Sequence, residues 1–452
     1  MQFHKNAASL LKAVKTCTKR LFPLLGVNKT REIERLLYEI AKRDHVMPKD
    51  ILPKLVPADF SAAKALLLRK RYPEAHKSGV AVKPYLPDLI MPLGKRGRIS
   101  GTAFCPKYIY AEKAAADSWL TLRARALFPK ARYEAIASLK SFVSNRGRFT
   151  IEDYNRRRET LFIVMEKFDF LKPCPCTKHA RGCGYHILNI GTGCIFDCSY
   201  CYLQRYINTP GIVIPANIDS FFGAFGCIYG SRRHLRIGSG EFSDSLMLDH
   251  LTSYAPQLVS FFKGYPDASF EFKTKSANVE NLLKAGPGRN IVVSWSLNPP
   301  EIIAENEPMT STLPERLKAA KLCRDAGYRI GIHFDPIIRY TGWENDYTGL
   351  IHTLFTHVLP GDIAWISLGT LRFRPDTKKV IEARFPENSI LNGELLIDFD
   401  GKLRYPYPAR RRIYRTILDT LLKYSPRLPV YLCMEETRMW KDLGLIFPFR
   451  AA

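Results

Sequence analysis

Short apolar runs alternate with longer amphipathic runs between residues 186 and 371. The apolar runs have the length of strands, and each of the first five precedes a segment with the apolar spacing of a helix. Because a helix-length crossover separates successive strands, the predicted sheet is parallel. The six predicted strands lie within residues 186–193, 234–240, 269–276, 290–298, 329–338 and 362–371.

Six strand–helix units fit two α/β architectures, a partial barrel and a doubly wound sheet. In both, the loops at the carboxyl ends of the strands carry the chemistry. His333 and Asp335 end the fifth predicted strand, where they could line a substrate cavity or hold hydrogen bonds within the core.

The N-terminal part predicts helices instead of this alternation. Residues 31–43 place four apolar side chains on one helical face, and a second helix is expected between an Asp59 cap and Pro73. The chain therefore divides into a basic helical module, an α/β lead-in region, a barrel and a C-terminal segment that completes the core. These four parts are residues 1–103, 104–180, 181–400 and 401–452.

The charge of the chain is strongly basic and unevenly distributed. The formal net charge is +25, and residues 1–100 hold 21 Lys and Arg against 8 Asp and Glu. A surplus of this size favours partners rich in phosphate, because binding releases counterions. The alternative is a solvated basic surface without a partner. We expect contact with DNA or another nucleic acid.

The cysteine content indicates the compartment. The chain has 11 cysteines, an odd number, and its N-terminal apolar stretch is interrupted by lysines. No apolar run reaches the length of a membrane span. We therefore expect a cytoplasmic protein without membrane contact, with cysteines used for metal or redox chemistry.

Three of the cysteines stand close together just after the first predicted strand. Cys194, Cys198 and Cys201 have the spacing C-x3-C-x2-C. A structural zinc ion and an ordinary four-iron cluster each take four protein ligands. Three thiolates instead leave one iron open to a small chelating ligand. The alternative is a zinc loop completed by Cys183 or His186.

The segment "CIFDCSYC", placed after a strand and before a strand–helix series, resembles the radical SAM superfamily, in which an aromatic residue such as Tyr200 commonly precedes the last cysteine. The resemblance implies a [4Fe-4S] cluster on Cys194, Cys198 and Cys201 and S-adenosyl-L-methionine (SAM) as cofactor. Reductive cleavage of SAM would give a 5′-deoxyadenosyl radical.

The segment "IGSGEFSD" after the second predicted strand resembles the Gly-Gly-Glu-type segment of this superfamily. By this resemblance Gly238, Gly240 and Glu241 contact the methionyl amine of SAM. The alternative is a strand-to-helix turn in which Ser243 or Asp244 caps the next helix.

The longer segment "CSYCYLQ" resembles the spore photoproduct lyase family, and so do "FKTK", "SLN", "AGYRIGIHFDPII" and "GWENDY". The resemblance spans about residues 105–452. It implies a partial (β/α)6 barrel, and removal of a hydrogen atom from a thymine dimer in DNA by the radical. Further SAM contacts would be Asp244, Lys275, Ser296 and Asn298, and Tyr200 and Tyr202 would relay a radical.

One departure from the family concerns the hydrogen atom that returns to the product. The lyases carry a cysteine for this step, whereas residues 238–244 contain none. Cys433 and Tyr202 are then the candidate donors. The departure leaves open another nucleic-acid base, or a substrate other than nucleic acid.

A non-catalytic, metal-containing nucleic-acid-binding protein is the alternative to an enzyme. For the enzyme, we expect flavodoxin or ferredoxin as electron donor. Cys174, Cys176 and Cys183 could bind a second metal, although unligated neighbouring thiols are the simpler interpretation.

Overall fold

The structure is a computed structural model that describes residues 7–52, 59–93, 103–167, 172–229 and 234–446. The chain forms two compact units. Unit 1 comprises residues 1–100, 338–341 and 370–413, and unit 2 comprises residues 101–337, 342–369 and 414–452. The N-terminal helices therefore share a unit with a segment that follows the predicted barrel strands.

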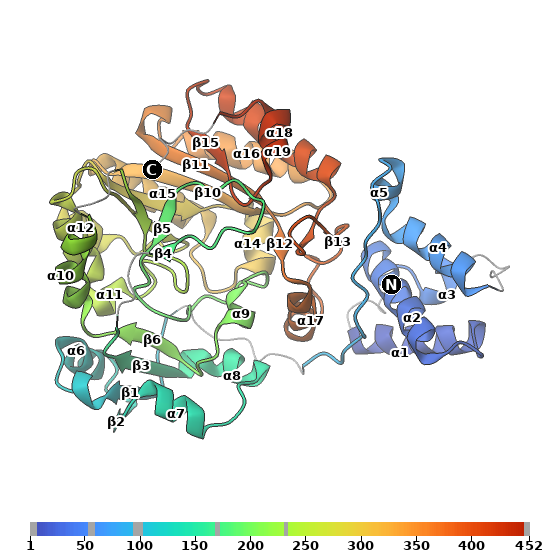
Figure 1. Ribbon diagram of the computed structural model, residues 1–452, viewed down its shortest axis with the longest axis horizontal. Helices are drawn as coiled ribbons and strands as arrows, with labels where there is room; N and C mark the ends of the chain where they lie inside the picture. The colour runs from blue at the N-terminus through green and yellow to red at the C-terminus, as the bar shows by residue number, and fades with distance from the viewer. Residues whose placement is uncertain (1–6, 53–58, 94–102, 168–171, 230–233, 447–452) are drawn as a thin grey trace. The chain divides into compact units, whose positions relative to one another are not determined.

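Unit 2 is built around a curved sheet of eight strands (Figure 1). The pairs from β5 to β10 and the pair β11–β15 are parallel, and β4 pairs antiparallel with β5. In pairing order the strands are β15 (Val430–Leu432), β11 (Ile363–Thr370), β10 (Arg329–Ile337), β9 (Ile291–Ser296), β8 (Ser269–Thr274), β7 (Arg236–Gly238), β5 (Tyr185–Ile187) and β4 (Lys172–Pro173).

The six predicted strands correspond to β5 and to β7 through β11, so the predicted α/β fold with a partial barrel is confirmed. Helix α15 packs on β9 and β10, and α12 packs on β9. None of the described helices combines the length and apolar character that a membrane span needs. The helices that follow the barrel strands are α9 (Leu203–Tyr206), α10 (Ile218–Tyr229), α11 (Asp249–Thr252), α12 (Tyr254–Lys263), α13 (Glu280–Ala285), α14 (Pro300–Asn306), α15 (Leu313–Asp325), α16 (Trp343–Phe355) and α19 (Thr437–Leu443).

The interior of the barrel sheet holds one fully buried carboxylate, Glu271 on β8. His333 Nε2 lies 2.8 Å and Trp365 Nε1 2.9 Å from the Glu271 carboxylate. Tyr185 and Ser294 donate their hydroxyl hydrogens to it as well. Hydrogen bonds from four other strands therefore converge on Glu271, and His333 has a hydrogen-bonded role inside the core.

A second, parallel sheet lies beside the barrel within unit 2, in the order β2–β1–β3–β6. Its last strand follows the three-cysteine loop in sequence, so the lead-in region is completed by residues from the barrel range. The elements are β1 (Tyr108–Glu112), η2 (Lys113–Ala115), α6 (Trp119–Leu127), β2 (Arg132–Ile136), α7 (Leu139–Asn145), α8 (Ile151–Arg156), η3 (Arg157–Glu159), β3 (Thr160–Val164) and β6 (Ile212–Pro215).

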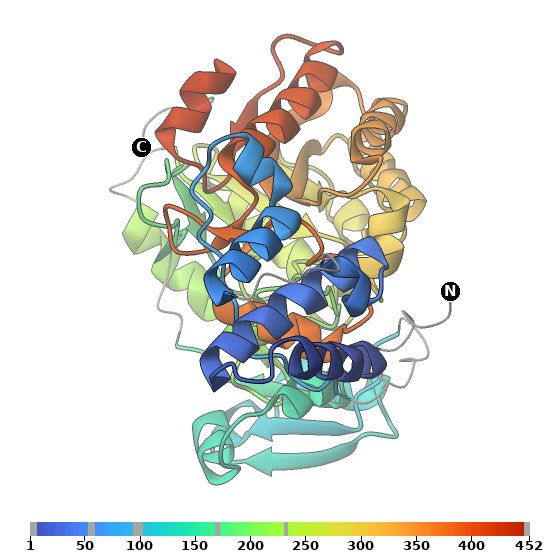
Figure 2. The same ribbon diagram turned by 90° about the vertical axis from the view of Figure 1, so that its right-hand side faces the viewer.

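Unit 1 begins with five helices, drawn in blue in Figure 2. The predicted apolar face is confirmed, because Ile33, Leu36, Leu37 and Ile40 are buried in its core. Asp59 caps α4 as predicted, by accepting from the Ala62 amide at 3.0 Å. The helices are α1 (Ala7–Leu21), α2 (Val27–Asp44), α3 (Pro48–Ile51), α4 (Phe60–Arg71) and α5 (Pro73–Lys77).

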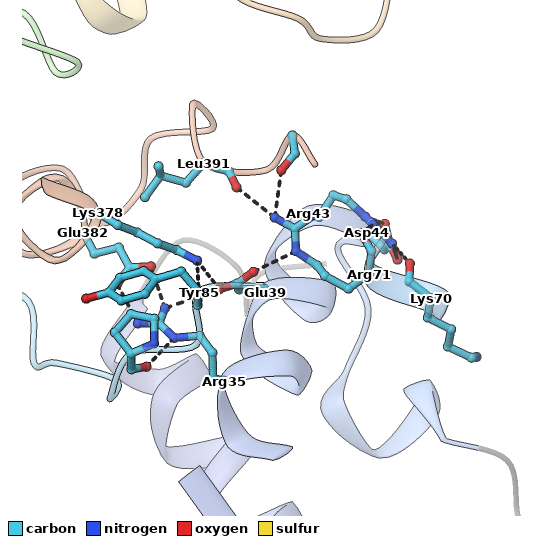
Figure 3. Close-up of polar contacts among 12 residues, drawn as sticks. Arg35, Glu39, Arg43, Asp44, Lys70, Arg71, Tyr85, Lys378, Glu382 and Leu391 are labelled. Carbon is cyan, nitrogen blue, oxygen red and sulfur yellow. Dashed lines mark hydrogen bonds and ion pairs between the residues drawn. The ribbon is translucent and has the colours of Figure 1, made fainter. Parts of the chain in front are cut away.

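The later segment of unit 1 is joined to these helices by a buried ion network (Figure 3). Glu39 accepts from Arg71 at 2.8 Å and from Lys378 at 2.6 Å, while Arg35 pairs with Glu382 at 2.6 Å. The later elements are β12 (Arg372–Phe373), α17 (Pro375–Arg384), β13 (Leu396–Ile397), β14 (Leu403–Arg404) and the start of α18 (Tyr407–Leu422). Residues 1–100 are therefore no independent appendage, because their buried cations and carboxylates find partners beyond residue 370.

The charge of Glu39 depends on its three cationic neighbours. Burial opposes ionisation, but Lys378, Arg71 and Arg35 together lower the pKa of Glu39 to about 2. A carboxylate whose folded-state pKa is lowered stabilises the fold above its unfolded pKa, and this contribution is lost as the pH falls. The network therefore weakens between about pH 4 and pH 2.

We expect Glu39→Gln to destabilise unit 1 by about 3–5 kcal/mol, because it leaves buried cations without their counter-charge. Urea unfolding of the full chain, followed by hydrogen exchange of α2, measures the loss. The control is Glu32→Gln on the same helix, whose exposed pair with Lys64 spans 2.7 Å and is worth under about 1 kcal/mol. Equal stability of the two variants would contradict the role of the network.

Candidate active site

The three predicted cluster ligands lie on one loop between β5 and α9. Cys198 is buried, and Cys194 and Cys201 are partly exposed. Because β5, β7 and β8 are parallel, the segments that follow them meet at one end of the barrel. The loop therefore lies at the end of the barrel where the chemistry of such folds takes place.

One buried guanidinium fixes the first half of this loop. Arg157 Nε donates to the Cys194 carbonyl oxygen at 3.0 Å, and Nη2 donates to the Phe196 carbonyl oxygen at 2.6 Å. Nη2 also lies 3.2 Å from Asp197 Oδ1. A loop without helix or sheet hydrogen bonds needs such partners for its buried carbonyl groups. Arg157 thereby sets the backbone between the first two cysteines.

The second half of the loop is fixed from the segment after α14. The Ser199 amide donates to the Asn306 carbonyl oxygen at 2.8 Å, and the Ser199 hydroxyl donates to Asn306 Oδ1 at 2.6 Å. The Gln204 amide group donates to the Ser199 carbonyl oxygen at 2.7 Å. The backbone around Cys198 is therefore held from two directions.

Tyr200, a predicted radical relay, is buried and donates its hydroxyl hydrogen to Glu307. Glu307 also pairs with Arg316 at 2.6 Å and accepts from Asn298 Nδ2 at 2.8 Å. Burial opposes the charge of Glu307, but Arg316 and then Lys275 lower its pKa. Tyr200 thus faces an ionised carboxylate, and its catalytic role stays a prediction.

Asp244 links the segment after β7 to the end of β8. Its carboxylate accepts from Thr274 Oγ1 at 2.6 Å, from the Lys275 amide at 2.7 Å and from the Leu246 amide at 3.0 Å. Burial raises the pKa of Asp244, and these hydrogen bonds counteract the rise. In this structure Asp244 orders the turn that was predicted to bind SAM.

The other residues of this turn differ in their surroundings. A Cβ atom at Gly238 would lie 1.5 Å from the Tyr185 hydroxyl oxygen, so packing alone requires glycine there. Gly240 has more room, since the nearest atom to such a Cβ lies 3.4 Å away. The Glu241 carbonyl oxygen accepts from the Tyr202 hydroxyl. Tyr202 is 41% exposed, so its ring is open to a ligand at this end of the barrel.

The predicted SAM contacts on the later strands lie in the same region of unit 2. The Lys275 ammonium group lies 5.8 Å from the centre of the Tyr200 ring. Ser296 ends β9, and its carbonyl oxygen accepts from Arg316 at 2.8 Å. Asn298 donates to Glu307 and accepts from the Tyr347 hydroxyl at 2.7 Å. Both polar ends of Asn298 are therefore engaged within the protein, and its contact with SAM stays a prediction.

The thiols of the loop fit a cluster better than a single ion. Among the described residues, no three His, Cys, Asp or Glu side chains lie close enough to hold one metal ion. A four-iron cluster binds each cysteine to a different iron, so its ligands stand farther apart. Burial, Asp244 and Cys201 raise the pKa of Cys194 to about 12, so the loop must lose protons when cationic iron binds.

The same finding bears on the other metal sites that the sequence left open. The described Cys183 and His186 complete no zinc site with the loop, and Cys174, Cys176 and Cys183 form no three-ligand metal group. These three cysteines are free thiols in partly exposed positions. The interpretation of them as unligated neighbours therefore agrees with the structure.

The sequence did not indicate the residues that hold the cluster loop. Arg157 lies 37 positions before Cys194, within a run of three arginines that has no motif spacing. Asn306 and Glu307 lie more than 100 positions after the loop, in an irregular segment. Only folding brings them to the cysteines.

Comparison with known proteins gives consistent matches. The sequence model of the spore photoproduct lyase family matches residues 104–398. A spore photoproduct lyase of Geobacillus sp. (strain Y412MC61) is 28% identical over 346 residues, which cover 72% of this chain and 98% of the relative. The corresponding enzyme of Bacillus subtilis (strain 168) is 28% identical over 253 residues, which cover 54% of this chain and 71% of the relative.

A solved spore photoproduct lyase variant with bound AdoMet and dinucleoside spore photoproduct superposes with a TM-score of 0.64 and 25% identity. The superposition covers 74% of this chain and 99% of that chain. Residues 1–103 lie outside the family match.

We expect the triple variant Cys194→Ala, Cys198→Ala, Cys201→Ala to lose the iron that anaerobic reconstitution gives the wild type, about four atoms per chain. The matched control replaces Cys174, Cys176 and Cys183 with alanine and should keep its iron. Iron analysis and visible absorbance measure both. Undiminished iron in the first variant would contradict the assignment of the ligands.

Proposed function

Because the chain belongs to the spore photoproduct lyase family, we propose that it is a radical SAM lyase acting on a thymine photolesion in DNA. The observation that carries this proposal is the three-thiol loop, fixed by Arg157 and Asn306 at the carboxyl end of the barrel strands. Relatives with the same fold bind AdoMet and a dinucleoside spore photoproduct.

Cys194, Cys198 and Cys201 would hold a [4Fe-4S] cluster whose fourth iron stays open for SAM. Once bound, the two cofactors supply a 5′-deoxyadenosyl radical that removes a hydrogen atom from the substrate. The contribution of the protein is orientation, since the loop backbone is already hydrogen-bonded before any ligand arrives.

The described residues suggest how SAM would be oriented. Glu241 is the carboxylate nearest to the predicted amine position, and Lys275 is the cation available for the methionyl carboxylate. Burial opposes the charge of Lys275, but Glu307 and Cys198 raise its pKa, so it stays protonated at neutral pH. Gly240 leaves space for the close approach of a ligand.

The remaining partners are inferred from the chemistry. A small ferredoxin or flavodoxin would supply the electron. The described cysteines are free thiols, which favours a reducing compartment such as the cytoplasm.

For the first test, the wild type is reconstituted anaerobically, reduced, and given SAM with a dinucleotide spore photoproduct. We expect 5′-deoxyadenosine and thymidylyl-thymidine, and neither product from Cys198→Ala. Cys323→Ala, which removes a buried thiol on α15, is the control and should resemble the wild type. Absence of 5′-deoxyadenosine in the iron-loaded wild type would contradict radical SAM activity. Its formation without repair would contradict only the lesion.

Helix α1 of unit 1 is the best candidate for contact with the DNA backbone. Its buried face is Leu10, Leu11 and Val14 with their neighbours, and its four charged side chains are all basic. Those four, Lys12, Lys15, Lys19 and Arg20, are exposed and form no salt bridge within the described part of the chain. On α2, by contrast, Arg31 and Arg35 are paired with carboxylates. The unpaired cations of α1 can therefore neutralise phosphates without breaking internal pairs.

We expect replacement of Lys12, Lys15 and Lys19 with glutamine to weaken DNA binding and to flatten its salt dependence. Each lost phosphate contact lowers the slope of log K against log salt by about 0.9. The control removes equal charge by replacing the exposed Lys284, Lys318 and Lys321 of unit 2 with glutamine. Fluorescence anisotropy with duplex DNA at several salt concentrations gives the slopes. Equal slopes for the two variants would show that α1 is only a solvated surface.

A further inference from the structure

The two ends of the barrel sheet are joined by a seam of main-chain contacts within unit 2. The Arg181 amide donates to the Glu435 carbonyl oxygen at 2.9 Å, and Ala180 forms an isolated antiparallel bridge with Glu436. The first segment follows β4 and the second follows β15, the two edge strands of the sheet. Residues about 250 positions apart in sequence therefore lie side by side.

Four cysteines gather at this seam, and we name them the seam thiols: Cys174, Cys176, Cys183 and Cys433. The side chain of Cys174 is hydrogen-bonded to Cys176, and Cys433 and Cys183 are its next sulfur neighbours. The backbone fixes both segments, since the Cys174 amide donates to Tyr185 at 2.7 Å and the Cys433 amide donates to Leu368 at 2.8 Å. The cluster thus combines two loops that the sequence gives no reason to connect.

The seam thiols keep their hydrogen atoms. All four are free and partly exposed, and no three of them are arranged to hold a metal ion. The hydrogen bond with Cys176 and then burial raise the pKa of Cys174, and burial raises the pKa of Cys183. At neutral pH these groups are therefore S–H groups, and their hydrogens exchange with solvent.

Tyr202 connects this cluster with the predicted SAM turn. Cys174 is among the groups within electrostatic range of the Tyr202 hydroxyl. That hydroxyl donates to the Glu241 carbonyl oxygen, and the ring is 41% exposed. A thiol, a phenol and the turn after β7 therefore follow one another in space.

We propose that the seam thiols are the hydrogen-atom donor of the reaction, with Cys174 passing a hydrogen atom through Tyr202 to the substrate radical. This inference rests on the proposed function and deepens it. The phenol O–H bond breaks as a C–H bond forms on the product, which leaves a tyrosyl radical. The S–H bond of Cys174 then breaks as the phenol O–H bond re-forms, which leaves a thiyl radical.

The neighbouring thiols complete the balance of this step. A thiyl radical on Cys174 can exchange a hydrogen atom with Cys176 and the others, so the radical spreads over the cluster. A small-molecule thiol from solvent then gives up its own hydrogen atom, which restores the S–H group and carries the radical away. The partial exposure of the four residues makes this exchange accessible. The cluster thereby occupies a role that no cysteine in residues 238–244 can fill.

The test measures two products of the reconstituted enzyme in deuterated water, with a dinucleotide spore photoproduct and a small thiol. In the wild type we expect solvent deuterium in the repaired methyl group. In Cys174→Ala and Tyr202→Phe the ratio of repaired product to 5′-deoxyadenosine should fall at least about tenfold, while 5′-deoxyadenosine still forms. Cys323→Ala is the control and should keep the wild-type ratio.

Two results would overturn the donor role: an unchanged ratio in Cys174→Ala, or wild-type product without solvent deuterium. A wild type that forms no 5′-deoxyadenosine would instead overturn the proposed function, and so the two failures are distinguishable.

A second measurement needs no cofactor. Mild diamide oxidation of the full chain, followed by peptide mapping, should give a disulfide within the seam thiols that includes Cys174. Cys174→Ala should abolish that disulfide. Oxidation that joins only other cysteines would show that the cluster does not exist in solution, and would overturn the proposal.

Discussion

The barrel depends on one buried carboxylate more than on any other polar group. Glu271 lies in the middle of the sheet and accepts hydrogen bonds from Tyr185, Ser294, His333 and Trp365, which come from four other strands. An unpaired charge in such a place would be very costly, so the five side chains define one register of the strands. That register brings the carboxyl ends of β5, β7 and β8 together, and the predicted active site is assembled there.

The cluster loop is a second case in which buried polar groups provide order. It contains no helix or strand of its own, and its carbonyl groups are taken up by Arg157 from one side. Asn306 and Glu307 hold Ser199 and Tyr200 from the other side. Such a loop can present three thiols without first paying the entropy of ordering. The same network keeps the ionised Glu307 and Lys275 close to the cofactor site.

Unit 1 shows how a chain can extend a known fold. Residues 1–103 precede the family match, yet their helices share a core and an ion network with residues 370–413. Glu39 on α2 is satisfied only through Lys378, far along the chain. The basic surface of α1 is therefore attached to a folded unit that also contains part of the family region, and not to a flexible tail.

The sequence by itself determined the elements and the chemistry. Periodicity gave the six barrel strands, because the alternation of apolar runs and amphipathic runs is a local property of the chain. The spacing of Cys194, Cys198 and Cys201 indicated a cluster, because one short loop supplies all three ligands. Tertiary structure alone decided what joins these parts. Glu271, Arg157, Glu39 and the seam thiols owe their roles to partners up to hundreds of positions away, and hydrogen bonds and ion pairs of that kind leave no periodic trace in the sequence.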